Sequence, residues 1–153
     1  VFNKQLSEII SKTLFNKNEA KEIRRLYEYL KSKSKPQTRL DANDVLPDNF
    51  RLNNGKVYFV DVDSIVPRIR LFAVGKAFFR WFKDIKEQEY FRKGYQSVSS
   101  MKFFTETYHD FINLNFLVQD IYYMIIFEKK EKSKWGIRIF QVRSLLEKYK
   151  SNL

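Results

Sequence analysis

Apolar residues recur at helical spacing at the start of the chain. The first set comprises Leu6, Ile9, Ile10 and Leu14, and the second comprises Ala20, Ile23, Leu26, Tyr27 and Leu30. Between the two sets, Asn16 followed by Glu19 three residues later has the pattern of a capping box, which marks the start of a helix. We therefore expect two amphipathic helices within residues 1–32.

The middle of the chain carries a strong hairpin signal. Phe50 and Leu52 alternate with polar residues, and the run from Val57 to Val62 is rich in residues that favour strands. Between them, Asn53-Asn54-Gly55 suits a tight turn whose two central residues need positive φ. We expect a hairpin over residues 50–62, preceded by a loop over about residues 33–48. The hairpin should bury Phe50, Leu52 and the apolar face of its second strand.

After Pro67 the pattern becomes helical again. The expected helices cover Ile69 to Ile85, a short piece near Tyr90 to Tyr95, Met101 to Phe127, and Trp135 to Tyr149, with the charged segment Glu128 to Lys134 as a linker. Aromatic residues at helical spacing are usually core, which is the expectation for Phe72, Phe78, Phe79, Trp81 and Phe82. The fold class expected is mainly α with one β-hairpin, in a single domain over residues 1–153.

The most apolar window runs from Phe111 to Phe127, and polar residues interrupt it. It is also shorter than a membrane span requires, so we expect a buried core helix and no transmembrane segment.

Composition removes several kinds of site. The chain has no cysteine, which excludes disulfides, thiol nucleophiles and cysteine-based zinc sites and favours a reducing, cytoplasmic location. His109 is the single histidine, so a histidine-based metal site is excluded and His109 itself is expected to be a surface or core residue. The net charge of +11 predicts attraction to nucleotide phosphates, nucleic acid or acidic headgroups, or simply a solvated lysine-rich surface.

Two acidic segments flank the hairpin. Asp44 is followed five residues later by Asn49, and the second strand leads into Asp61-Val62-Asp63. Kinases use an Asp beside the acceptor hydroxyl, an Asn that binds metal, and a further Asp that bridges Mg²⁺ to the nucleotide phosphates. In the alternative interpretation, these side chains cap turns and solvate a strand end.

This stretch resembles the catalytic loop, hairpin and metal-binding loop of the kinase-like phosphotransferases. The similarity is closest to aminoglycoside phosphotransferases, choline kinases and the kinases that act on lipopolysaccharide sugars. Asn43-Asp44 resembles their His-Asn-Asp or His-Gly-Asp, Pro47-Asp48-Asn49-Phe50 their Pro-Gly-Asn, and Val60-Asp61-Val62-Asp63 their Ile-Asp-Phe-Asp. More weakly, Gly75-Lys76-Ala77-Phe78 and Phe91-Arg92-Lys93-Gly94-Tyr95 resemble later parts of these families.

The resemblance implies a protein-kinase-like C-terminal lobe. In such a lobe residues 1–32 are helical, 40–49 form the catalytic loop, 50–62 the hairpin, and 68–150 the remaining helices. It further implies that Asp44 is the catalytic base and that Asn49, Asp61 and Asp63 bind metal. The implied cofactors are Mg²⁺ and ATP, and the implied acceptor is a hydroxyl of a small molecule or sugar.

Two departures from the family pattern affect the expected activity. Ala42 replaces the family's His, and the 43 residues before Asp44 contain no Gly that could form a phosphate loop. We therefore expect little kinase turnover from this chain alone, with the N-terminal lobe supplied by the rest of a larger kinase or by a partner chain. The alternative function is a non-catalytic basic module that binds nucleic acid or another anion.

Overall fold

The computed structural model describes residues 1–12, 14–42, 47–60, 65–82, 84–98, 105–129 and 132–153. The chain is mainly helical, as expected, with two small antiparallel strand pairs. It divides into two units, which are treated separately below. Unit 1 comprises Val1–Lys35 and Glu106–Leu153, and unit 2 comprises Pro36–Thr105. The single-domain expectation over residues 1–153 stays a prediction.

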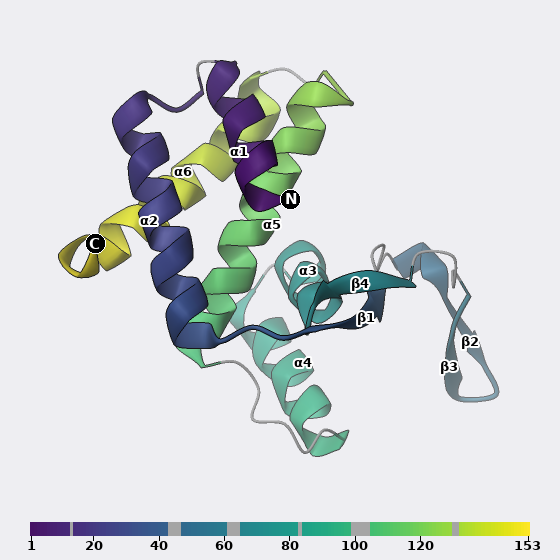
Figure 1. Cartoon of the computed structure of the whole chain (residues 1–153). Helices are drawn as coiled ribbons and strands as arrows, with labels where there is room; N and C mark the ends of the chain where they lie inside the picture. Colours follow the sequence, from purple (N-terminus) through teal and green to yellow (C-terminus); the bar gives the residue numbers. More distant parts are fainter. Residues whose placement is uncertain (13, 43–46, 61–64, 83, 99–104, 130–131) are drawn as a thin grey trace. The chain divides into compact units, whose positions relative to one another are not determined.

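Unit 1 is a bundle of helices in which α5 is central. Its elements are α1 (Phe2–Ser11), α2 (Lys17–Ser34), α5 (Glu106–Ile126) and α6 (Lys132–Tyr149), followed by a short 3-10 turn at Lys150–Asn152. Helix α5, green in Figure 1, packs against α1, α2 and α6. Among the described residues it carries more buried side chains than any other helix of unit 1, because its apolar side chains face three neighbours. Among the described residues, no helix is long and apolar enough to cross a membrane.

The N-terminal helices form as their sequence predicts. Leu6, Ile9 and Ile23 are fully buried in the core. The capping box is present: the Asn16 side chain accepts a hydrogen bond from the Glu19 amide at 2.9 Å, and the Asn16 amide donates to the Glu19 carboxylate at 2.9 Å. These two bonds satisfy donors that a helix start leaves unpaired, which fixes where α2 begins.

Charged pairs also tie α6 into unit 1. Arg143 donates to Glu19 of α2 at 2.7 Å, and Arg138 donates to Asp120 of α5 at 2.9 Å. Asp120 is buried, so its charge requires a partner such as Arg138. α6 is therefore held by specific pairs as well as by apolar packing.

Unit 2 contains all the strands that the structure describes. Its elements are β1 (Thr38–Ala42), the 3-10 turn η1 (Pro47–Asn49), β2 (Phe50–Asn53), β3 (Lys56–Phe59), β4 (Ile65–Ile69), α3 (Phe72–Trp81) and α4 (Ile85–Val98). β1 pairs with β4 from Thr38↔Ile69 to Ala42↔Ile65, and β2 pairs with β3 from Phe50↔Phe59 to Asn53↔Lys56; both pairings are antiparallel (Figure 1).

The hairpin turns where the sequence predicts. Asn54 has φ 49° and Gly55 has φ 72°, as a turn with two positive φ angles requires. The predicted burial is wrong at Leu52 and Val57, which are 75% and 68% exposed. The physical reason is that α3 meets the opposite end of the hairpin, where the Phe50 ring contacts Trp81 edge-on at 5.6 Å. The turn end of the apolar face is left uncovered within unit 2.

The strand pair β1–β4 was not predicted. β1 lies inside the expected loop over residues 33–48, and β4 covers Ile69, where a helix was expected to begin. Their hydrogen bonds join segments far apart in sequence, so no short window reveals them. Pro67, which lacks an amide donor, is tolerated because each strand of a two-stranded sheet is an edge.

The helices of unit 2 also differ in length from the prediction. α3 begins at Phe72, after Leu71 at φ 65°, and ends at Trp81 instead of reaching Ile85. α4 covers Ile85–Val98 and is longer than the expected short piece. The expectation that the aromatic set is core is confirmed for Phe72, which is buried. Phe78 and Phe82 are half-buried and pack on Phe91 of α4, with ring centroids 6.2 and 4.8 Å apart.

Candidate functional site

Residues 43–46 and 61–64 carry most of the predicted catalytic and metal residues, and each segment adjoins a strand of the β1–β4 pair. β1 ends at Ala42 and β4 begins at Ile65, and the Cα atoms of these two residues are register partners. Facing residues of an antiparallel pair lie about 4.5–5.5 Å apart. The chain therefore leaves β1 and enters β4 at neighbouring points.

The described residues at the other ends of the two segments are also neighbours. Val60 donates its amide hydrogen to the Asn49 carbonyl oxygen at 2.9 Å, next to the Phe50↔Phe59 pair. The chain thus enters β2 and leaves β3 at neighbouring points as well. Residues 43–46 and 61–64 are accordingly bracketed by the same two strand pairs, although they are far apart in the sequence.

Asn49 is the one predicted metal ligand within the described residues. It ends η1 and is half-buried. Its bond to Val60 places it beside the residue that immediately precedes Asp61. The predicted ligand Asn49 is therefore bonded through its backbone to Val60, which precedes the predicted ligand Asp61 in the sequence.

Asp44, Asp61 and Asp63 lie outside the described residues, so their roles stay predictions. Asp61 follows Val60 directly, Asp63 stands two residues before Ile65, and Asp44 stands two residues after Ala42. Within the described part of the chain, no group of three or more His, Cys, Asp or Glu residues could hold a metal ion.

Neighbouring side chains fix the described ends of these segments. The Asp41 carboxylate accepts a hydrogen bond from the Ala73 amide at 3.2 Å, which ties the end of β1 to the first turn of α3. Arg51 folds back from β2 and donates to the carbonyl oxygens of Asp48 and Phe50 at 2.5 and 2.9 Å. The frame around the acidic segments is therefore held by side chains as well as by strand pairing.

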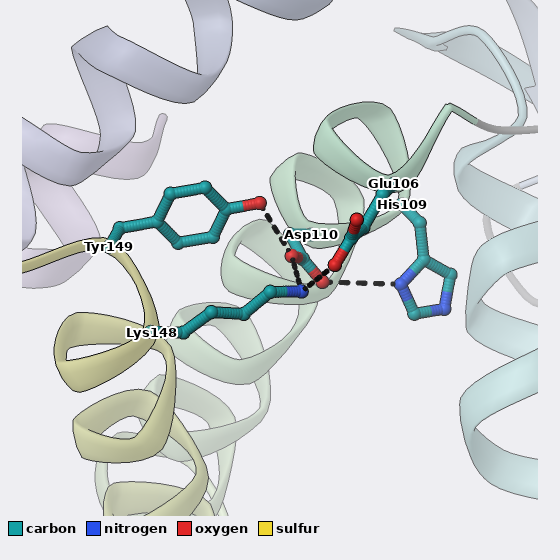
Figure 2. Close-up of polar contacts among 5 residues, drawn as sticks. All are labelled: Glu106, His109, Asp110, Lys148 and Tyr149. Carbon is teal, nitrogen blue, oxygen red and sulfur yellow. Dashed lines mark hydrogen bonds and ion pairs between the residues drawn. The ribbon is translucent and has the colours of Figure 1, made fainter. Parts of the chain in front are cut away.

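A second polar cluster lies in unit 1 around Asp110 (Figure 2). The buried Asp110 carboxylate accepts from the Tyr149 hydroxyl at 2.7 Å and from the Lys148 ammonium at 2.6 Å. His109 Nδ1 lies 3.3 Å from its other oxygen. Lys148 also contacts Glu106 at 2.6 Å, so the cluster joins the start of α5 to the end of α6.

The pKa shifts in this cluster indicate a structural role. Burial opposes ionisation of Asp110, but hydrogen bonds from His109, Lys148 and Tyr149 outweigh it and lower its pKa. Burial opposes the Lys148 charge, but its bonds to Asp110 and Glu106 raise its pKa. Burial, followed by the bond to Asp110, raises the pKa of Tyr149. Each group thus stabilises the protonation state that its neighbour needs, so we interpret the cluster as a brace and not a reactive centre.

The sequence did not reveal the Asp110 cluster. Asp110 follows Glu106 by four residues, the spacing of one helix face, and this was a local signal for a shared cation. Its partners Lys148 and Tyr149 stand 38 and 39 residues away, which no sequence pattern anticipates. His109, expected to be a surface or core residue, is half-buried and contacts Asp110.

No protein-family model matches the chain, and comparisons with curated proteins and with solved structures find no significant match. The residues and their geometry are therefore the only basis for proposing a function.

Proposed function

We propose that this chain forms the Mg²⁺-binding lobe of a phosphotransferase that uses ATP. Asp44 orients and deprotonates a hydroxyl of a small molecule or sugar, Asn49 and Asp61 hold Mg²⁺, and Asp63 is a further metal ligand. The observation that carries the proposal is the bracketing of both acidic segments by the same two strand pairs, with Asn49 bonded to Val60.

Phosphoryl transfer makes particular demands on a protein. It depends chiefly on positioning and on neutralising charge at the phosphate oxygens, with little covalent chemistry by the protein. Mg²⁺ prefers a few carboxylates together with phosphate oxygens, so a small group of Asp and Asn oxygens is a suitable binding set. A carboxylate beside the acceptor hydroxyl serves as the general base.

The order of elements also supports this proposal. η1 and the hairpin follow one acidic segment and precede the other, as the resemblance to kinase-like phosphotransferases implies. β1 and β4 add a feature that the sequence did not suggest, because they bring the outer ends of the two segments to one place. Holding the ends of both segments together lowers the entropic cost of bringing the metal ligands to one place.

The second candidate is the non-catalytic anion-binding module. A net charge of +11 favours anionic partners in general. The acidic segments themselves would repel a polyanion unless a cation bridged them, so anion binding would have to occur elsewhere on the chain.

The metal role of Asp61 is testable by calorimetry. We expect Mg²⁺ alone to bind weakly and Mg²⁺ with ATP to bind appreciably, because nucleotide oxygens complete the coordination shell. Asp61→Asn should weaken binding of Mg²⁺ and ATP at least about tenfold, since it removes an ionised metal ligand.

The matched control is Asp48→Asn, which removes the same charge from an exposed residue of η1. We expect this variant to bind Mg²⁺ and ATP within about twofold of the native chain, since exposed charges contribute little. Equal heats for the native chain and Asp61→Asn would exclude Asp61 from the metal site. Equal losses in the two variants would show a general charge effect.

A further inference from the structure

Unit 2 contains a pocket of about 300 Å³ that the proposed phosphotransferase site does not use. Its polar lining comes from Arg39 and Asp41 of β1, Arg70 after β4, and Tyr95 of α4, with Leu71 and Val74 among its apolar walls. A volume near 300 Å³ is at the lower end of the range for small-molecule sites, so the pocket suits a compact ligand.

The strand register places both arginines on one face. Arg39 pairs with Arg68, and the Arg70 amide donates to the Gln37 carbonyl oxygen at 2.7 Å, which continues the same ladder. Residues two apart on a strand, and residues paired across strands, point to the same side of the sheet. Arg39 and Arg70 therefore project from adjacent strands toward the same side as Asp41.

The charges around the pocket favour an anion. Among the described residues that line the pocket, Arg39 and Arg70 carry guanidinium groups and Asp41 carries a carboxylate, which accepts from the Ala73 amide. The pocket also adjoins the first turn of α3, whose partial positive charge is shared with the Asp41 carboxylate through its bond to the Ala73 amide. Guanidinium groups suit phosphate and carboxylate because they can donate two parallel hydrogen bonds.

We propose that this pocket binds a compact small molecule bearing a phosphate or carboxylate group, held by Arg39 and Arg70. Tyr95 also lines the pocket, and a tyrosine hydroxyl can hydrogen-bond to a polar group on a ligand. Binding here needs no metal, and none of the lining residues is a metal ligand or base in the function proposed above.

The test is an NMR titration of the full chain with inorganic phosphate and with glycerol 3-phosphate, in the presence of EDTA. We expect saturable shifts of backbone amide signals within residues 39–41 and 70–74. Arg39→Gln and Arg70→Gln should each weaken binding at least about tenfold, because each removes a charged donor from the anion. Arg92→Gln, at an exposed position of α4 outside the lining, should leave the affinity within about twofold.

The spectra also report whether each variant remains folded. Arg39 is exposed, so Arg39→Gln keeps the test valid even if Arg70→Gln perturbs the strand pair. Shifts that spread over the whole chain without saturation would overturn the proposal, as would equal affinities for Arg39→Gln and Arg92→Gln. Asp61→Asn separates the two sites: it should leave phosphate binding unchanged here while weakening binding of Mg²⁺ and ATP.

Discussion

Asp110→Asn should lower the free energy of unfolding by about 2–3 kcal/mol at pH 7, because it removes the charge that Lys148 and Tyr149 both contact. Losing one partner of a buried charged group can cost more, up to about 5 kcal/mol. The Lys148 side chain is 41% exposed, however, and water replaces part of its interaction. Urea unfolding followed by circular dichroism measures the difference.

Glu106→Gln is the matched control for this substitution. Glu106 contacts the same ammonium group at the same 2.6 Å, but its side chain is 74% exposed. We expect a loss of at most about 1 kcal/mol, as for other exposed ion pairs. Equal losses in the two variants would mean that burial of Asp110 has no role in the brace.

The effect of Asp110 should depend on pH in a defined direction. Its pKa in the folded chain lies below the ordinary value of 3.8. A lowered pKa means that the carboxylate stabilises the fold above the unfolded value and loses this contribution as the pH falls through the folded pKa. The difference between the native chain and Asp110→Asn should therefore be complete at pH 7 and shrink below about pH 4.

Phe111→Ala should lower the free energy of unfolding by about 3–5 kcal/mol, the usual cost of emptying a buried aromatic site. The Phe111 side chain is fully buried in α5, and its ring lies 5.5 Å from the Tyr27 ring of α2. The same urea measurement applies.

Phe140→Ala makes the same deletion at an exposed position of α6. It should change stability by no more than about 0.5 kcal/mol. A small loss for Phe111→Ala would contradict the description of α5 as the centre of unit 1.

The parts of the fold that the sequence predicted correctly depend on local signals. The capping box at Asn16 and the turn at Asn54-Gly55 each involve residues within a few positions of one another. The apolar spacing of Leu6 and Ile9 likewise reports one face of α1, and that of Ile23 and Leu26 reports one face of α2.

The parts that were missed depend on distant partners. β1 and β4 form by pairing with each other, so neither has a pattern strong enough to be recognised alone. Leu52 was expected to be buried because it alternates with polar residues, but alternation gives no information on how far a helix covers the hairpin. The Asp110 brace was missed for the same reason.

In the candidate site, too, some features follow from local sequence signals and others depend on distant partners. The residue types and their spacing suggested Asp44, Asn49, Asp61 and Asp63 as one chemical group. The register between Ala42 and Ile65, and the bond between Asn49 and Val60, supply a physical reason for the two segments to act together. The bond between Asn49 and Val60 follows from the register that the turn at Asn54-Gly55 sets, but the pairing of Ala42 with Ile65 could not be derived from the sequence alone.

Paramagnetic NMR with Mn²⁺ and ATP tests whether the two acidic segments form one metal site. Mn²⁺ accepts the oxygen ligands that Mg²⁺ uses and broadens the signals of nearby amides. We expect the amide signals of Ala42, Asn49, Val60 and Ile65 to broaden together in the native chain, and all four to recover in Asp61→Asn. Broadening of Asn49 and Val60 without Ala42 and Ile65, or no broadening in this region, would contradict the account.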